Sequence, residues 1–194
     1  MWFPPSALPR GRHNKTGCPV LAVDTAMPLK GVPMNNPNLS TEHDYNGSAF
    51  KPLYVTRVAV NGGSSDHGRA TGQARSADGA LALELRMPEE LGGDNPGPNP
   101  EQLFAAGYAA CFHGALSLLA RRHLLDPGPI TVEATVAFGR DPSDGGYQLR
   151  AELAVTWPGV DRGTAGPLLT QAAALCPYAK MTRHGIPATI NLAC

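Results

Sequence analysis

Two of the four cysteines, Cys111 and Cys176, fall on the apolar faces of two predicted helices, where they could act together as a redox pair. Cys18 lies in a proline-rich N-terminal segment and Cys194 is the last residue, so neither is expected in a catalytic geometry. The N-terminus shows no apolar stretch typical of a secretion signal, which favours a reducing compartment, where paired thiols are more often catalytic than structural. The simpler alternative is that both helical cysteines are small core hydrophobes.

A reactive Cys111 would need a positive charge beside it. Only the thiolate attacks, and apolar surroundings raise the pKa of a thiol, so a cation must offset the burial. Arginine suits this role because it keeps its charge when desolvated and can also hold an oxygen anion or a peroxide. Five arginines are candidates, and spacing does not choose among them: Arg57, Arg69, Arg75, Arg86 and Arg183.

Two other kinds of cysteine chemistry have weaker support. Cys111 and His113 are two positions apart on a helix and so point in different directions. The chain has no Cys-x-x-Cys or His-x-x-x-His pair, so a metal site is not expected. A cysteine hydrolase would require a histidine base, for which only His67 or His184 is available, without any supporting motif.

The strands that would position these residues begin near residue 53. Residues 1–52 hold eight of the nineteen prolines and show no regular period, which predicts a disordered extension before a domain at 53–194. Apolar and β-branched runs predict strands at 53–60 and 81–87, with an ambiguous segment at 69–76 between them. Alternating apolar residues predict three further strands, at 130–138, 147–157 and 186–192.

The first predicted helix carries Cys111. Asn99 suits the N-cap, Pro100 the first helical position, and Glu101 the positive end of the helix dipole. The helix is expected to run to about His123. Its predicted buried stripe consists mainly of small residues, so another helix or other backbone should pack closely against it: Leu103, Gly107, Ala110, Cys111, Gly114 and Leu118.

A second helix is expected before the last strand. It is predicted to end at Pro177, and its apolar face consists of Leu168, Ala172, Leu175 and Cys176. The resulting order, βββ-α-ββ-α-β, segregates strands from helices and predicts an α+β fold.

The composition excludes several classes of protein. Lys plus Arg and Asp plus Glu both number 16, so the chain has no excess charge with which to capture nucleic acid. No run of about 18 apolar residues indicates a transmembrane helix. We therefore expect a cytoplasmic protein without nucleic-acid or membrane partners.

The segments around the two cysteines resemble a known family. The run from Asn99 to Phe112, NPEQLFAAGYAACF, is similar to the signature of the organic hydroperoxide resistance (Ohr) proteins of the Ohr/OsmC superfamily. Cys176-Pro177-Tyr178 followed by Thr182-Arg183 resembles their second cysteine motif, and Glu90-Leu91-Gly92-Gly93 also matches. The resemblance covers about residues 53–193 and implies an OsmC-like fold, with two sheets and central helices interlocked in a homodimer.

The resemblance implies a role for each residue of the site. Cys111 would be the peroxidatic cysteine and Cys176 the resolving cysteine, which forms an intramolecular disulfide with it. An arginine of the N-terminal strands, best matched by Arg69 with Arg75 as the second choice, would pair with Glu101. Separately from the resemblance, we expect aromatic side chains to line an apolar approach for alkyl and lipid hydroperoxides: Tyr108, Phe112 and Tyr178, with Phe104 beside them. Each also fits a plain core position, which is favoured for Phe104.

The implied activity is that of a thiol-dependent peroxidase acting in oxidative stress defence. The family's reductants are dithiols of the lipoamide type, supplied by lipoylated enzyme complexes, and no bound metal or flavin is implied. The alternative is an OsmC-type protein that binds ligands or senses redox state through the same disulfide, without efficient turnover.

The spacing of Glu101 and Cys111 bears on assembly. They are ten positions apart on one helix, or about 15 Å along its axis, so their side chains cannot share a site within one chain. If Glu101 orients the arginine that activates Cys111, it must come from a second subunit, which predicts a homodimer with two equivalent sites at its interface. The alternative is that Glu101 only interacts with the helix dipole.

Overall fold

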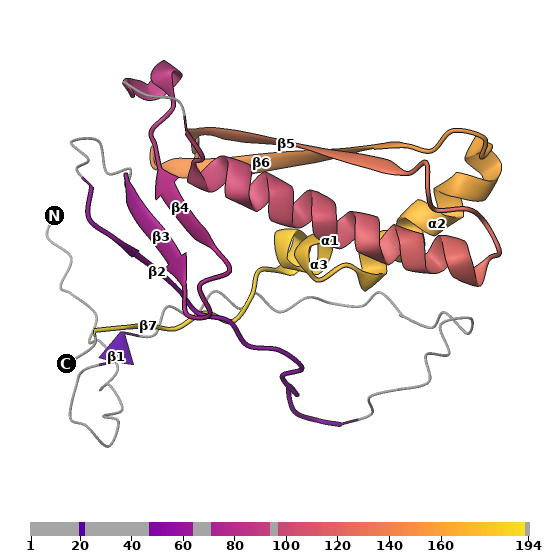
Figure 1. The fold of residues 1–194 in the computed structure, drawn as a ribbon, viewed down its shortest axis with the longest axis horizontal. Coiled ribbons are helices and arrows are strands. Elements are labelled where there is room, and N and C mark those ends of the chain that lie inside the picture. The colour runs from indigo at the N-terminus through magenta and orange to yellow at the C-terminus, as the bar shows by residue number, and fades with distance from the viewer. Residues whose placement is uncertain (1–19, 22–46, 64–70, 94–96, 193–194) are drawn as a thin grey trace, which may run out of the picture.

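The computed structural model describes residues 20–21, 47–63, 71–93 and 97–192, which form an α+β fold, as predicted (Figure 1). The strands are β1 Val20–Leu21, β2 Val58–Asn61, β3 Gly72–Ser76, β4 Ala82–Leu85, β5 Thr131–Arg140, β6 Tyr147–Thr156 and β7 Ile190–Asn191. They pair into antiparallel sheets with the orders β2-β3-β4, β5-β6 and β1-β7. The helical elements are the 3-10 turn η1 Glu89–Leu91 and the helices α1 Pro100–Arg122, α2 Arg162–Leu175 and α3 Pro177–His184.

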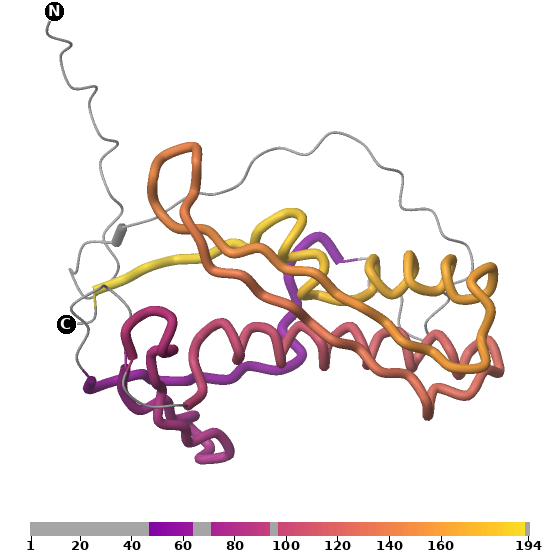
Figure 2. The backbone as a smooth tube through the Cα atoms, turned by 90° about the horizontal axis from the view of Figure 1, so that it is seen from above, coloured from indigo at the N-terminus to yellow at the C-terminus, as the bar shows by residue number. Residues whose placement is uncertain are grey.

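The core forms where the β5–β6 hairpin and helices α2 and α3 pack around α1. The hairpin runs along α1 in both views, whereas the β2–β4 sheet lies beside the N-terminal end of the helix (Figures 1 and 2). The buried core residues come mainly from the C-terminal half of α1, from the open end of the hairpin and from α2: Leu116, Leu119, Ala120, Ile130, Trp157, Leu168 and Ala172.

The start of α1 follows from its first residues. Asn99 caps the helix, because its side-chain oxygen accepts the N–H of Gln102 at 2.9 Å. The side-chain oxygen of Gln102 accepts the N–H of Asn99 at 3.1 Å in return, which completes a capping box. The predicted helix start at Asn99, with Pro100 in the first position, is therefore confirmed, and His123 is the C-cap.

The predicted buried stripe of α1 is right for Leu103, Gly107 and Cys111, which are partly buried, and wrong for its other three residues. Ala110, Gly114 and Leu118 are exposed, whereas Phe112 and Leu116 are buried. The helix is apolar on nearly every side, so its hydrophobic period does not single out one face. The described chain covers one side of it and leaves a line of small and apolar residues uncovered on the other: Ala106, Ala110, Gly114 and Leu118.

Among the helices of the described residues, only α1 is long and apolar enough to span a membrane. Such a segment was not expected from the sequence. Its position offers a different explanation for that composition. It is the central helix of the core, with β5, α2 and α3 packed against it, and such a helix is apolar on most sides.

The second predicted helix is two helices in the structure. Pro177 ends α2, because its ring cannot continue a helix, but it also occupies the first position of α3, where a proline is favourable. Cys176 lies between them in an extended conformation, as the C-cap of α2 and the N-cap of α3. Because a proline within a helical pattern predicts only the end of a helix, α3 was not expected.

The strands differ from prediction near both ends of the domain. The predicted strand at 53–60 begins only at Val58, and the ambiguous segment at 69–76 contributes β3 from Gly72. Of the predicted strand at 186–192, only Ile190–Asn191 is paired, with β1. Because β1 comes from the predicted N-terminal extension, the short pair was not foreseeable from local alternation. The boundary at residue 52 stays a prediction.

We expect replacement of Asn99 by alanine to lower the free energy of unfolding by about 1 kcal/mol, because the N-cap acceptor of α1 is lost. Urea denaturation followed by circular dichroism measures this change. Asn99→Asp, which keeps an acceptor oxygen, is the control and should retain most of the stability. An alanine variant as stable as the wild type would contradict the capping role.

Candidate active site

The structure brings Cys111 and Cys176 together. Their Sγ atoms lie 2.8 Å apart, and both thiols are free. Cys111 comes from the middle of α1 and Cys176 from the α2–α3 junction, so the packing of three helices sets this distance. A disulfide bond is about 2.0 Å long, so a small movement of the side chains suffices to link the two sulfurs.

The first turn of α3 offers backbone N–H groups to both sulfurs. The side chain of Cys176 accepts the N–H of Ala179 at 3.5 Å. The N–H of Tyr178 donates to Cys111 and acts to lower the pKa of that thiol. Such N–H groups have no partner within the helix itself and form the positive end of its dipole. The sequence signal for this arrangement was Pro177 directly after a cysteine, a pattern typical of a helix start.

The pKa of Cys111 is nevertheless raised, from 9.0 to about 11. Burial is the main cause, and the hydrogen bond with Cys176 adds to it. No arginine or lysine of the described residues is among the influences on this pKa. At neutral pH these surroundings alone would keep Cys111 almost entirely as the unreactive thiol.

The arginine candidates are distributed as follows. Arg69, the preferred candidate, lies outside the described residues, as does His67. Arg75 donates to the side-chain oxygen of Gln73 at 3.2 Å, and Arg86 forms an ion pair with Glu84 at 2.7 Å. The Arg183 side chain donates to the carbonyl oxygens of Ala173 and Ala179, and Arg57 is exposed.

Aromatic side chains cover the region next to Cys111. The rings of Tyr108 and Tyr178 are stacked with their centroids 6.1 Å apart, and Phe104 lies against both. Gly107 permits this packing, since a Cβ atom there would lie 2.9 Å from the Tyr178 hydroxyl. Tyr108 and Tyr178 are partly exposed, so both rings have surface to offer a ligand.

Phe112 does not lie with these aromatic rings beside Cys111. Its side chain is only 6% exposed and belongs to the hydrophobic core. Adjacent residues of a helix point in directions about 100° apart, so a ring next to Cys111 in sequence turns away from the thiol. We therefore assign Phe112 to core packing and not to the substrate approach.

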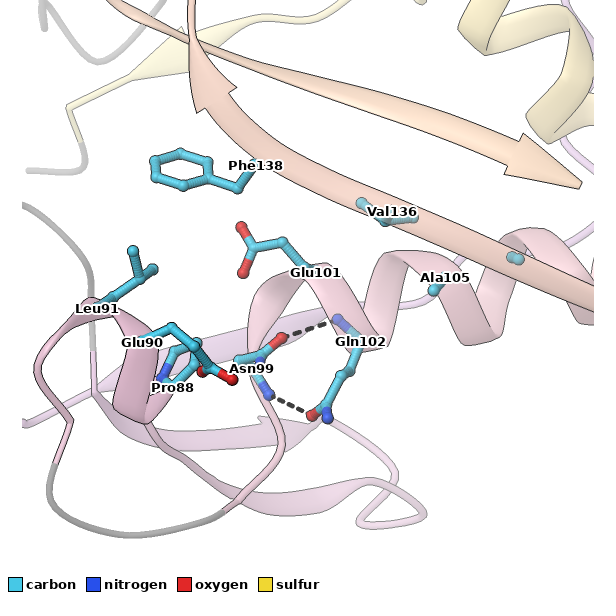
Figure 3. A pocket seen from close by; sticks show the side chains of 10 residues that line it. Pro88, Glu90, Leu91, Asn99, Glu101, Gln102, Ala105, Val136 and Phe138 are labelled. Carbon is cyan, nitrogen blue, oxygen red and sulfur yellow. Dashed lines mark hydrogen bonds between the residues drawn. The ribbon is translucent and has the colours of Figure 1, made fainter.

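Glu101 lies in the first turn of α1, in a cavity of about 450 Å³. Its carboxylate points toward Phe138 of β5, near Leu91 (Figure 3). The cavity is also lined by Asn99, Ala105 and Val136. Because α1 is continuous from Pro100 to Arg122, Glu101 and Cys111 remain about 15 Å apart along the helix axis. The structure does not bring these two predicted site residues together.

The histidines considered for other chemistry lie elsewhere. The ring of His113 donates from Nε2 to the carbonyl oxygen of Ile130 at 3.2 Å. His184 is the last residue of α3, at the opposite end of that helix from Cys176. Within the described ranges, no group of three or more His, Cys, Asp or Glu side chains is arranged to hold a metal ion.

Comparison with known proteins relates this arrangement to a family. Residues 92–191 match the OsmC-like protein family. The organic hydroperoxide resistance protein of Xanthomonas axonopodis pv. citri (strain 306) is 41% identical over 148 residues, which span 75% of this chain and 99% of that protein.

Solved structures give the same relationship. The organic hydroperoxide resistance protein from Elizabethkingia anophelis is 40% identical with a TM-score of 0.62, over 69% of this chain and 91% of that one. OhrB of Bacillus subtilis is 39% identical with a TM-score of 0.59, over 68% and 93% of the two chains. The fold, the two cysteine motifs and these relatives together show that the chain belongs to the OsmC-like family.

Proposed function

We propose that this protein is a thiol-dependent peroxidase that reduces organic hydroperoxides to alcohols and serves in defence against them. The observation that carries the proposal is the 2.8 Å approach of Cys111 Sγ to Cys176 Sγ. Its relatives are named organic hydroperoxide resistance proteins, which supports the same class of substrate.

In the proposed reaction the Cys111 thiolate attacks the distal oxygen of the hydroperoxide. The O–O bond breaks, the alkoxide takes up a proton and leaves as the alcohol, and Cys111 becomes a sulfenic acid. The Cys176 sulfur then attacks the Cys111 sulfur, and the hydroxyl group leaves as water, which yields the disulfide. Because the sulfurs are already close, this second step requires no movement of the helices.

The first step requires an ionised Cys111, which burial opposes. We assign the missing positive charge to Arg69, with Arg75 as the second choice. The N–H of Tyr178 does not offset the burial, since the pKa still rises to about 11. A guanidinium would both lower that pKa and bind the leaving oxygen.

We further propose that the arginine is held by Glu101 and that the pair serves the Cys111 of a second subunit. The position of Glu101 supports this, since a rigid helix keeps it about 15 Å from the Cys111 of its own chain. The uncovered side of α1, formed by Ala106, Ala110, Gly114 and Leu118, is small and apolar enough to pack closely against a second copy. The result is a homodimer with two equivalent sites.

The rings of Tyr108 and Tyr178 would line the approach and favour alkyl and lipid hydroperoxides over hydrogen peroxide. The reductant would be a dithiol of the lipoamide type, presented by a lipoylated protein, and no metal or flavin takes part. A reducing compartment such as the cytoplasm suits this cycle, because the disulfide must be reopened after each turnover.

Turnover separates the proposed enzyme from a redox sensor or ligand-binding protein with the same disulfide. We expect steady-state reduction of cumene hydroperoxide with dihydrolipoamide as the electron donor. In the Cys111→Ser variant the rate of cumene hydroperoxide reduction should fall to the uncatalysed rate, because the nucleophile is lost. Cys176→Ser should reduce one equivalent and accumulate a sulfenic acid that dimedone traps. Disulfide formation without turnover would favour the sensor, and full turnover by Cys176→Ser would contradict the resolving role.

Ala110→Arg tests the dimer. A bulky charge on the uncovered side of α1 should shift the protein to a monomer in light scattering and reduce peroxidase turnover strongly, since each site would lose the partner's Arg–Glu pair. Thr170→Arg adds the same side chain to an exposed position of α2. It should leave both the oligomeric state and the peroxidase turnover unchanged. A monomeric wild type, or an Ala110→Arg dimer with full activity, would contradict this assembly.

A further inference from the structure

We propose that the reductant attacks the Cys111 sulfur of the Cys111–Cys176 disulfide, so that Cys176 leaves as the thiolate and the mixed disulfide forms on Cys111. This inference rests on the proposed peroxidase cycle and specifies its second half. It also determines which side of the disulfide the reductant must reach.

The two sulfurs differ in access. Cys176 is 0% exposed and belongs to the hydrophobic core together with Phe112, Leu168 and Ala172. Cys111 is only partly buried and packs on the edge of that core. A thiolate must approach the attacked sulfur along the S–S axis, so access decides between the two ends. Reaching Cys176 would require separating the helices that enclose it, whereas Cys111 already has solvent-accessible surface.

This difference carries over from the reduced to the oxidised protein. The Sγ atoms are 2.8 Å apart in the reduced form, and a bond of about 2.0 Å closes the gap with a shift of less than about 1 Å. Such a shift leaves the helices in place, so Cys176 remains enclosed in the disulfide form.

The surroundings of Cys176 also suit a leaving group. Its sulfur caps the N-terminus of α3 and accepts the N–H of Ala179 at 3.5 Å. A thiolate released there meets a hydrogen-bond donor and the positive end of the α3 dipole.

The steps balance with a dithiol as the only added reagent. One reductant thiolate forms a bond to the Cys111 sulfur, the Cys111–Cys176 bond breaks, and Cys176 keeps the electron pair. The second reductant thiolate then attacks the reductant's own sulfur in the mixed disulfide. This releases Cys111 as the thiolate and the reductant as a cyclic disulfide, and Cys176 takes up a proton. The reductant is oxidised by two electrons and the protein is reduced by two.

Hydroperoxide and reductant would therefore reach the same sulfur from the same side, past Tyr108 and Tyr178. Both cannot occupy this approach together, so the alcohol must leave before the dithiol binds. Steady-state rates at several fixed dithiol concentrations should give parallel double-reciprocal lines, as expected of a ping-pong mechanism.

A trapping experiment on the full-length protein tests the attacked position. The protein is oxidised with one equivalent of cumene hydroperoxide, mixed briefly with 2-mercaptoethanol, quenched in acid under denaturing conditions and blocked with N-ethylmaleimide. Trypsin places Cys111 in residues 87–121 and Cys176 in residues 163–180, so mass spectrometry assigns each label. Cys176→Ser, oxidised to the sulfenic acid and given the same thiol, supplies the reference Cys111 adduct.

We expect mercaptoethanol on Cys111 and maleimide on Cys176. This labelling should exceed the reverse, with mercaptoethanol on Cys176 and maleimide on Cys111, by at least about tenfold, because attack on Cys176 needs local opening of the core. Equal labelling, or mercaptoethanol mainly on Cys176, would overturn the inference. If hydroperoxide forms no Cys111–Cys176 disulfide, the proposed function fails before any thiol is added. Disulfide made with diamide then still tests the attacked position separately.

Discussion

The close packing of Cys111 against Cys176 imposes the constraint on which the rest of the site depends. Three helices hold the two sulfurs 2.8 Å apart, but the same packing removes water from Cys111 and raises its pKa to about 11. The N–H of Tyr178, in the first turn of α3, acts in the opposite direction without offsetting the burial. The described chain thus provides proximity between the sulfurs, and the charge that would make Cys111 reactive must come from elsewhere.

The continuous helix α1 separates the two halves of the proposed site. Cys111 lies near its middle beside Tyr178, while Glu101 lies in the first turn, in a cavity against the β5–β6 hairpin. One rigid element thereby holds an acid and a nucleophile too far apart to cooperate within one chain. A second copy packed on the uncovered side of α1 would resolve this, since the same helix could then contribute a nucleophile to one site and an acid to the other.

The sequence predicted those features whose causes are local. Asn99 and Pro100 specify the start of α1 through capping chemistry, and alternation located the β5–β6 hairpin. The buried side of α1 could not be predicted, because an almost wholly apolar helix gives no directional signal. Of the two positions that the sequence left open for Phe112, the structure shows the one in the core. Helix α3 was missed because Pro177 ends one helix and starts another. The apolar faces of the two predicted helices allowed Cys111 and Cys176 to act as a pair, but their meeting depends on tertiary packing, which spacing does not encode and which the family resemblance implied.

The most direct test of the central claim is the pKa of Cys111 in the full-length protein, from the pH dependence of its alkylation by iodoacetamide in the Cys176→Ser background. A cation at the site predicts a value well below 9.0, the ordinary value for a cysteine thiol. Arg69→Met should raise it markedly, whereas Arg75→Met should not. A Cys111 that titrates near 11 with every arginine in place would contradict the account, since burial would then be unopposed.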